Sequence, residues 1–290
     1  MDERVSIIIA LFNAENYINE TILSVINQSY TNWELIIIDD GSTDGSAHII
    51  QQHLIDNRIQ YFKKYNTGVS DSRNFGANIA TGIFLCFLDA DDLFHYNNIK
   101  EKLDFLMSNP EYPLVHADVE LIDENSNSTG GYFKGKGGNI LNSLLLWQET
   151  NIPGPSSTMM TKNIFYNIGQ WDVAFSTAAD QELFFRVAAK HPIGHINKVL
   201  TSYRVLPNSM SRNISIMEKD HVSVYKKAYK NGLFKSFWFK QQCFSNLYFT
   251  LAGSWWINGK NKKRGIYFLI KALFIYPPVL VKLTKKVISK

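Results

Sequence analysis

The sequence has little of what marks several special classes of protein. Only two of its 290 residues are cysteines, Cys86 and Cys243, which excludes a scaffold held together by disulfides. Cys86 lies inside an apolar run, so we predict a buried and inert thiol. The start of the chain leads directly into a strand-like segment without an apolar leader, so we expect a protein of the reducing cytoplasm.

The usual motifs for binding phosphate are also missing. There is no GxxxxGK[ST] loop, and no GxGxxG motif follows the first predicted strand. The segment Gly41–Ser46 is rich in glycine, but it carries Asp44 in a region where a phosphate cradle would have lysine. A diphosphate bound by this chain would therefore need a cation from elsewhere.

Acidic and basic residues are unevenly distributed along the chain. Apolar residues make up 45% and charged residues 19%, a composition typical of globular proteins. Residues 1–212 contain 15 Lys and Arg against 24 Asp and Glu, whereas residues 213–290 contain 15 against 2. The split predicts an acidic catalytic body and a basic C-terminal region directed at an anionic surface.

The first half of the chain alternates between strand and helix patterns. Val5–Leu11 is a nearly unbroken apolar run, as expected of a parallel strand that is covered on both faces. Further strands are predicted at Trp33–Ile38, Ile59–Phe62 and Ile83–Leu88, and helices at 17–26, Ser46–Leu54 and Ser72–Ala80. The alternation predicts an α/β protein with a doubly wound, mostly parallel sheet. Ligands of such sheets bind at the carboxyl ends of the strands, where both acidic clusters of this sequence lie.

From about residue 96 the pattern becomes less regular. A helix is predicted at Ile99–Met107 and a strand at Leu114–Ile122. The segment Asn125–Asn139 is rich in glycine and is predicted to be a mobile loop. Two more predicted helices, Asn163–Ile168 and Gln181–Ala189, lie on either side of Asp180.

The C-terminal region is helical, aromatic and basic in pattern. An apolar helix face is formed by Ile266, Leu269, Ile270, Leu273 and Phe274. The apolar stretch is broken by Lys271 and by Pro277-Pro278, well short of the about 20 residues that span a bilayer. With Lys282, Lys285, Lys286 and Lys290 nearby, it suits a helix that lies in a membrane interface. A helical hairpin packed on the catalytic body or on a second subunit is the alternative, and the pattern does not favour nucleic acid as a partner.

The first candidate site is the cluster Asp89-Ala90-Asp91-Asp92. Carboxylates two residues apart at a strand end can point the same way, and their hard oxygens suit Mg²⁺ or Mn²⁺. Such an ion would hold a diphosphate and neutralise the charge of a departing nucleotide. A solvated acidic turn is the alternative, and it is the commoner explanation of an isolated DxD.

Three further residues have both a chemical and a structural explanation. Asp40, at a strand end, could accept hydrogen bonds from a base or a ribose, or could cap the next helix. Arg73 could contact a phosphate or pair with Asp71. Asp180 could act as a general base or as a helix cap, and local sequence does not decide between these roles.

The ordered set of motifs resembles family 2 glycosyltransferases over roughly residues 4–211. It comprises Val5–Asn13, Asp39-Asp40-Gly41-Ser42-Thr43-Asp44, Asn66-Thr67-Gly68 with Arg73-Asn74, Asp89-Ala90-Asp91-Asp92, Gly169-Gln170-Trp171-Asp172, Asp180-Gln181-Glu182-Leu183 with Arg186, and Tyr203-Arg204. The resemblance implies the A-type glycosyltransferase fold and an inverting transfer of one sugar. It implies a nucleotide-sugar donor, most often a UDP-sugar. The basic C-terminal region, directed at a membrane, favours a glycan or lipid-linked glycan of the cell surface as the acceptor.

The same resemblance implies a role for each candidate residue. Asp180 would be the catalytic base, and Asp91, helped by Asp92, would hold Mn²⁺ or Mg²⁺. The nucleotide-sugar site would comprise Ala10, Asp40, Arg73, Asp89 and Ala90, with Asp40 at the base and Asp89 at the ribose. Residues 1–95 would then bind the donor and 96–212 the acceptor, with 213–290 as a basic helical extension that contacts the inner face of the cell membrane.

The sequence departs from the family pattern at two positions. Ala179 stands where the family often has Glu, and Leu206 stands where it often has His. The first departure puts in doubt how the base is tuned, and the second removes a possible contact to metal or phosphate. A QxxRW motif of processive synthases is absent, which favours transfer of a single sugar. A nucleotidyltransferase and a catalytically silent binding subunit remain as alternatives.

Overall fold

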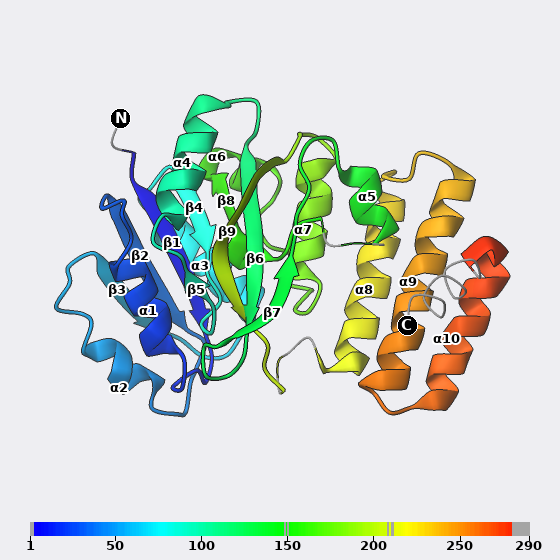
Figure 1. The fold of residues 1–290 in the computed structure, drawn as a ribbon, viewed down its shortest axis with the longest axis horizontal. Helices are drawn as coiled ribbons and strands as arrows, with labels where there is room; N and C mark the ends of the chain where they lie inside the picture. The colour runs from blue at the N-terminus through cyan, green and yellow to red at the C-terminus, as the bar shows by residue number, and fades with distance from the viewer. Residues whose placement is uncertain (1–2, 148, 150, 208, 210–211, 280–290) are drawn as a thin grey trace. The chain divides into compact units, whose positions relative to one another are not determined.

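The computed structural model describes residues 3–147, 149, 151–207, 209 and 212–279 (Figure 1). The chain divides into two compact units, Met1–Ile140 with Thr150–Leu206, and Leu141–Glu149 with Pro207–Lys290. The division differs from the expected boundary at residue 212 in two ways. It comes at residue 206, and the short segment 141–149 belongs to the C-terminal unit because the Tyr225 hydroxyl donates to the Leu145 carbonyl at 2.7 Å.

The first part of the N-terminal unit is the alternating α/β structure that the sequence predicts. Its four parallel strands are β1 (Val5–Leu11), β2 (Trp33–Asp39), β3 (Ile59–Lys63) and β4 (Phe84–Phe87), in the order β3-β2-β1-β4. The helices between them are α1 (Ile18–Ile26), α2 (Ser46–Gln51) and α3 (Val69–Ile79). β1, β2 and β4 are buried along almost their whole length because helices cover both faces of this sheet, whereas the edge strand β3 is only partly buried.

The second part extends the same sheet with strands of mixed direction. The order continues from β4 through β8 (Thr158–Thr161), β6 (Leu114–Ile122) and β9 (Gly194–Arg204) to β5 (Leu93–Phe94). β8 is antiparallel to both of its neighbours, whereas β6 and β9 are parallel. The helical segments of this part are α4 (Asn98–Ser108), the 3₁₀ turn η1 (Pro155–Ser157), α6 (Lys162–Asn167) and α7 (Ala179–Ala188).

The prediction of a mobile loop over Asn125–Asn139 is wrong for part of that segment. Residues Ser128–Phe133 form strand β7, which pairs antiparallel with β6. A β-bulge between Glu120 and Ile122 interrupts the pairing. Because strand pairing uses backbone groups, an edge strand needs no apolar side chains, and Gly130 and Gly131 concealed it in the sequence.

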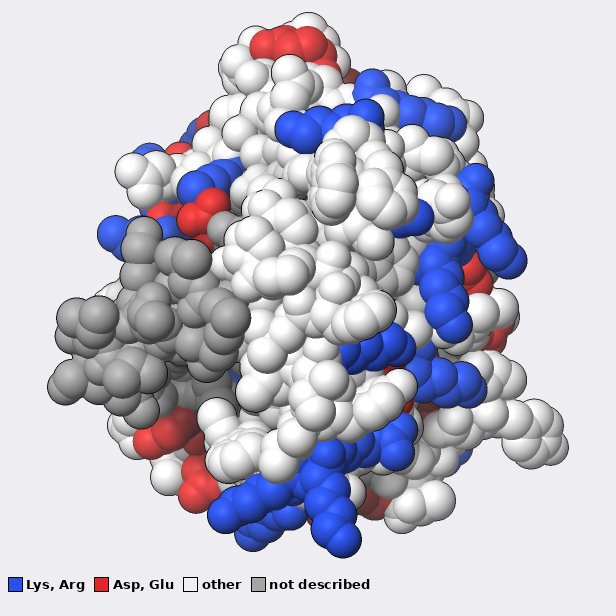
Figure 2. All heavy atoms as spheres, turned by 90° about the vertical axis from the view of Figure 1, so that its right-hand side faces the viewer, with Lys and Arg blue, Asp and Glu red and all other residues white. Residues whose placement is uncertain are grey.

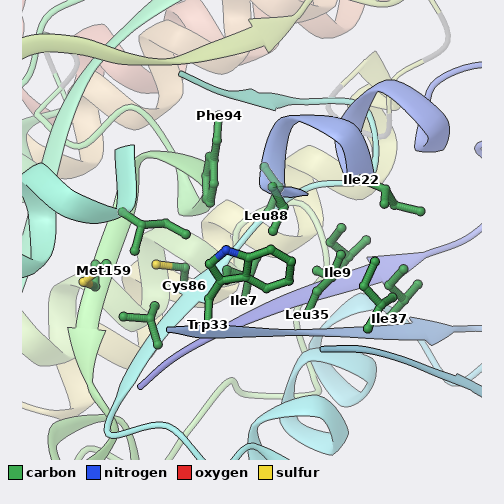
Figure 3. Packing of buried hydrophobic residues seen from close by; sticks show 14 of the residues in the cluster. Ile7, Ile9, Ile22, Trp33, Leu35, Ile37, Cys86, Leu88, Phe94 and Met159 are labelled. Atoms are coloured by element: carbon green, nitrogen blue, oxygen red, sulfur yellow. The ribbon is translucent and has the colours of Figure 1, made fainter. Parts of the chain in front are cut away.

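The core of the N-terminal unit lies on both faces of the sheet. Ile7, Ile9 and Leu35 point to one face, where they pack with apolar side chains of α1 and α4 (Figure 3). The alternate residue Ile8 points to the other face, where α3 lies. Cys86 is buried as predicted, and burial raises the pKa of its thiol to about 11.

The C-terminal unit is helical, as the sequence predicts. It consists of α5 (Leu141–Leu146), α8 (Ile214–Lys230), α9 (Phe237–Ile257) and α10 (Lys262–Ile275), followed by the 3₁₀ turn η3 (Pro277–Val279). Its core includes the buried side chains of Tyr225, Cys243, Leu247, Leu251 and Phe268. No helix in the described part of the chain has both the length and the apolar character needed to cross a membrane. The lysines at 282, 285, 286 and 290 lie outside the described residues.

The close approach of α3 to β1 makes Gly76 sensitive to substitution. A Cβ atom at this position would lie 2.5 Å from Ile8 Cγ2. Gly76→Ala should therefore lower the free energy of unfolding by about 1–3 kcal/mol, measured by urea unfolding, because a packed core does not readily accept added atoms. Gly253→Ala is the matched control, since Gly253 is an exposed glycine of α9 whose Cβ would meet nothing within 4 Å. That change should raise stability by about 0.5–1 kcal/mol, and an equal gain at both positions would contradict the packing argument.

Candidate active site at the carboxyl ends of the strands

The parallel strands bring the predicted site residues to one edge of the sheet. Leu11 at the end of β1 is in register with Asp39 at the end of β2, and the Asp40 N–H donates to the Leu11 carbonyl at 2.8 Å. β4 runs beside β1 on the other side, so Asp89 emerges at the same edge. Ala10 lies between these two acidic strand ends and is partly exposed.

Asp40 is buried and organises the segment that precedes α3. Its Oδ1 accepts from Lys64 Nζ at 2.5 Å and from the Thr67 N–H at 2.9 Å, and its Oδ2 accepts from the Gly68 N–H at 2.8 Å. An ionised carboxylate has about four acceptor positions, so one position on Oδ2 remains for a ligand. Asp40 therefore has room for a single donor such as a base N–H. It does not cap α2, whose N-terminus begins after Gly45.

The loops that follow β1 and β2 are joined by hydrogen bonds. Ser42 and Ser46 hydroxyl oxygens each accept from an N–H of the first loop, those of Asn13 and Ala14, at 3.0 Å. The acids take part in the same way: Asp44 accepts from the Glu15 N–H, and Glu15 accepts from the Gly45 N–H. Asp44 of the glycine-rich segment and Glu15 of the loop after β1 therefore each bind a backbone N–H of the other loop.

Arg73 is the central cation of the site. Its buried guanidinium donates to Asp89 Oδ1 at 2.6 Å and lies over the Trp171 ring, 4.6 Å from the ring centre. The next residue, Asn74, exchanges two hydrogen bonds with the Trp171 backbone, at 2.9 and 3.0 Å. Arg73 thus pairs with Asp89 and not with Asp71, whose side chain bonds to Lys64 and Thr67.

Asp91 and Asp92 are adjacent in sequence but have different surroundings. Burial, and to a smaller extent the charge of Asp89, raises the pKa of the Asp91 carboxyl to about 6. Burial and the charges of Asp91 and Asp89 raise the pKa of Asp92 well above its ordinary value. Asp92 is held inside the protein, where its two oxygens accept from the Ser156 hydroxyl at 2.6 Å and from the Arg204 N–H at 3.0 Å. Ser156 also accepts from the Asp89 N–H at 3.1 Å, so η1 fixes both ends of the cluster.

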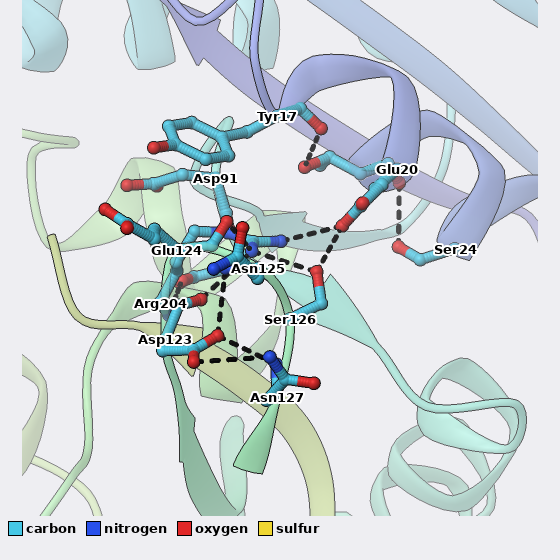
Figure 4. A network of polar contacts seen from close by, with 12 residues as sticks. Tyr17, Glu20, Ser24, Asp91, Asp123, Glu124, Asn125, Ser126, Asn127 and Arg204 are labelled. Carbon is cyan, nitrogen blue, oxygen red and sulfur yellow. Dashed lines mark hydrogen bonds and ion pairs between the residues drawn. The ribbon is translucent and has the colours of Figure 1, made fainter. Parts of the chain in front are cut away.

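Arg204 ties the acidic cluster to two other parts of the N-terminal unit (Figure 4). Its guanidinium is buried and donates to the Asp91 carbonyl at 2.9 Å and to Glu20 of α1 at 2.9 Å. It also donates to the Ser126 hydroxyl at 2.9 Å and lies over the Tyr17 ring at 4.9 Å. The turn after β6, the start of α1 and the acidic loop are therefore held together by one side chain.

Asp180 lies in the first turn of α7, because the helix begins at Ala179, two residues earlier than predicted. Burial raises the pKa of its carboxyl, and the negative charge of Asp89 acts in the same direction. The Gln181 N–H, 2.7 Å from Asp180 Oδ1, and the charge of Arg73 act in the opposite direction. Asp180 thus shares the electrostatic environment of Arg73 and Asp89, although it comes about 90 residues later in the chain. Ala179, beside it, is fully buried.

The side chains of this site suit a divalent cation that is completed by a ligand. Asp91 combines hard oxygen donors with a raised pKa, and a cation would relieve its repulsion from Asp89. Asp92 has both oxygens engaged within the protein, so the two carboxylates that remain are Asp89 and Asp91. Within the described residues no group of three His, Cys, Asp or Glu side chains is arranged to hold a metal. Mg²⁺ is commonly held by one or two carboxylates together with substrate phosphates, which agrees with this arrangement.

Sequence reasoning found the acids of the site but not the residues that hold them. Ser156 and Lys64 were not singled out, and Arg204 was quoted only as part of a motif. The Gly154-Pro155 pair before Ser156 is a turn signal that marked a defined loop. Nothing local to Lys64 or Arg204 indicates a contact with the site, because their partners come from distant parts of the sequence.

The raised pKa of Asp91 has a consequence for stability. An acid whose pKa is higher in the folded state than in the unfolded state lowers the free energy of unfolding as the pH rises past its unfolded pKa. The loss is complete once the pH is above its folded pKa. Asp91→Asn should therefore stabilise the metal-free protein at pH 7.5, by on the order of 1–3 kcal/mol. The gain should shrink as the pH falls through about 6, where the folded carboxyl becomes protonated.

The measurement is thermal and urea unfolding between pH 5 and 8 in EDTA. Asp104→Asn, at an exposed acid of α4, is the matched control and should change stability by no more than about 0.5 kcal/mol. A gain for Asp91→Asn that does not depend on pH would show that the carboxylate is not strained by its surroundings.

Known proteins resemble this chain in sequence. The model of the family described as glycosyl transferase family 2 matches residues 6–169, more than half of the chain. An uncharacterized glycosyltransferase of Rickettsia bellii is 31% identical over 205 residues, which cover 70% of this chain and 29% of that protein. A putative teichuronic acid biosynthesis glycosyltransferase of Bacillus subtilis, TuaG, is 41% identical over 105 residues, covering 36% of this chain and 42% of that protein. The chain thus spans less than half the length of either relative.

A solved structure resembles the chain in fold. The crystal structure of S. aureus TarS 1-349 in complex with UDP-GlcNAc matches with a TM-score of 0.65 at 16% identity, covering 93% of this chain and 79% of that chain. The likeness confirms the predicted A-type glycosyltransferase fold with its C-terminal helices. The match of the family model over residues 6–169 shows that the chain belongs to glycosyl transferase family 2.

Proposed function

We propose that this chain is an inverting glycosyltransferase that moves one sugar from a UDP-sugar to a hydroxyl of a glycan or lipid-linked glycan, in the assembly of a cell-surface polysaccharide. The observation that carries the proposal is that Asp89, at the end of β4, pairs with Arg73 and interacts electrostatically with both Asp91 and Asp180. TarS, with the same fold, was crystallised with UDP-GlcNAc, and TuaG is named for teichuronic acid biosynthesis. Both names agree with this class of donor and product.

On the donor side, each residue has a role that fits its surroundings. Asp40 accepts a hydrogen bond from the base through its remaining acceptor position, and the small side chain of Ala10 leaves space beside it. Asp89 accepts from the ribose through the oxygen that does not bind Arg73. The Ala90 carbonyl accepts from the Thr21 hydroxyl at 2.9 Å, which holds the backbone of the cluster in place.

Asp91 would hold Mg²⁺ or Mn²⁺ on the diphosphate. When bound, the ion supplies charge neutralisation for the departing nucleotide. Asp92 supports the loop from behind through Ser156 and the Arg204 N–H, and so we assign it a positioning role.

On the acceptor side, Asp180 takes the proton from the attacking hydroxyl. The hydroxyl oxygen forms its bond to the anomeric carbon as the bond from that carbon to the UDP oxygen breaks, which inverts the anomeric configuration. Burial raises the pKa of Asp180 towards the range in which a carboxylate accepts a proton effectively. The positive charge of Arg73 opposes this rise in the pKa.

The basic C-terminal region bears on the acceptor and on the location of the protein. The basic residues of 213–290, 15 against 2 acidic ones, favour peripheral contact with an anionic membrane on its inner face. A transferase held there would meet lipid-linked acceptors.

Asp180→Asn should abolish transfer and leave donor binding nearly intact. Loss of a general base costs about 10²- to 10⁴-fold in rate, whereas the amide keeps the size of the side chain. The rate is measured as UDP release in the presence of acceptor, and binding by calorimetry with UDP. Asp104→Asn serves as the control and should retain full activity. Full activity of Asp180→Asn would remove Asp180 from the mechanism.

Asp91→Asn should weaken metal-dependent binding of the donor by at least about tenfold, or about 1.4 kcal/mol. The measurement is calorimetry with a panel of UDP-sugars and other nucleotide-sugars, in Mn²⁺ and again in EDTA. The wild-type protein should bind one UDP-sugar tightly with Mn²⁺ and weakly with EDTA. Equal binding in both conditions would contradict the metal role. Binding of a donor without turnover on any acceptor would favour a silent binding subunit.

A further inference from the structure

Helix α10 has two apolar faces, and only one of them is buried. Gly265, Phe268 and Ala272 face α9, where the Phe268 ring stacks on Tyr248 at 5.8 Å and the Ser245 hydroxyl donates to the Ala272 carbonyl at 2.8 Å. A second stripe, four residues apart each time, consists of Ile266, Ile270 and Phe274. Their exposed fractions are 45%, 61% and 89%, so this stripe points away from the core.

The exposed stripe is extended by neighbouring apolar and aromatic side chains. Tyr267 of α10 is 57% exposed, and at the end of α9 Trp256 and Ile257 are 48% and 72% exposed. Trp256 lies beside the stripe, since a Cβ at Gly265 would lie 3.4 Å from its ring. We call the exposed side chains of Trp256, Ile257, Ile266, Tyr267, Ile270 and Phe274 the outer face of the C-terminal unit.

Positive charge borders the outer face. Lys260, Lys262 and Lys263 are all exposed at the turn between α9 and α10, and Lys262 Nζ lies 5.7 Å from the centre of the Trp256 ring. Residues 213–279 contain 11 Lys and Arg against two acids, and one of the acids, Glu218, is paired with Arg264 at 2.7 Å. Figure 2 shows this side of the molecule, with a broad uncharged area that is bordered by Lys and Arg.

The charges around the outer face indicate which kind of partner binds there. An isologous contact with a second copy would bring together two faces that are each bordered by lysines, and residues 213–279 contain only two acids to offset them, which is unfavourable. A spanning role is excluded for α10, because 14 residues extend only about 21 Å, against about 30 Å for the apolar core of a bilayer. Apolar side chains with Trp and Tyr beside them and lysines around them are typical of helices that lie in the interface of an anionic bilayer.

We propose that the outer face docks the C-terminal unit onto an anionic lipid bilayer, with α10 parallel to the membrane surface and Ile270 and Phe274 inserted among the lipid chains. The use of this contact to reach a lipid-linked acceptor rests on the proposed function, whereas the contact itself does not. The outer face is thus the surface that would hold the enzyme on the membrane.

The test is sedimentation of the full chain with vesicles of phosphatidylcholine containing 25% phosphatidylglycerol, without donor or metal. The wild-type protein should bind these vesicles, bind vesicles of phosphatidylcholine alone at least tenfold more weakly, and dissociate as NaCl rises from 0.1 to 0.5 M. The double variant Ile270→Ser with Phe274→Ser should lose at least tenfold in partitioning. Lys262→Glu with Lys263→Glu should lose binding to the anionic vesicles.

Ile55→Ser is the matched control, because Ile55 is 94% exposed in the N-terminal unit and the change has the same chemistry. It should bind vesicles as the wild type does. Equal binding by the Ile270 and Phe274 double variant, or no binding of the wild type to anionic vesicles, would overturn the proposal. A dimer in light scattering that the double variant converts to a monomer, without vesicle binding, would assign the face to a second copy.

Calorimetric binding of UDP to the double variant separates the two proposals and also reports on its folding. Loss of vesicle binding with UDP binding retained supports the outer face. If the wild-type protein binds UDP and transfers sugar but does not bind vesicles, only the membrane proposal is contradicted. If the wild-type protein binds vesicles but no nucleotide, only the proposed function is contradicted.

Discussion

The site depends on holding several carboxylates close together at the end of β4. Three acids within four residues repel one another, and burial strengthens that repulsion, as the raised pKa values of Asp91 and Asp92 show. Two buried arginines counter it from different directions. Arg73 pairs with Asp89 from α3, and Arg204 binds the Asp91 carbonyl from the end of β9. The remaining repulsion around Asp91 is the feature that would attract a divalent cation.

This requirement explains much of the architecture around the site. Arg73 reaches Asp89 because α3 lies close against β1, which in turn requires glycine at position 76. Arg204 reaches the cluster because β9 lies in the same sheet, with its end held at Asp92. Ser156, on η1, binds both Asp89 and Asp92 and is placed by the antiparallel strand β8 that follows it. Residues of the second half of the sheet therefore hold in place the acids at the end of β4.

The C-terminal unit has a different physical design. Its core is closed by α9 and the inner face of α10, and its helices still leave a second apolar face exposed beside a group of lysines. The sequence pattern that predicted an apolar face at Ile266, Leu269, Ile270, Leu273 and Phe274 identified mainly this exposed side. The buried contact uses Gly265 and Ala272, whose small size lets the two helices approach closely, and Phe268, whose ring stacks on Tyr248.

The sequence alone was enough to predict the parallel strands, the helices between them, the helical C-terminal region and the acids at the strand ends. These follow from local patterns: apolar runs, helical periodicity and acids placed directly after strands. Strand β7 was missed because pairing through the backbone leaves no mark on its side chains. Three features follow from the tertiary structure and not from local patterns: Asp92 is engaged within the protein, Arg73 pairs with Asp89 and not with Asp71, and Arg204 and Ser156 support the cluster. The physical reason is that these contacts join residues that are far apart in the chain, and the energy of a buried charge depends on all of its neighbours in space.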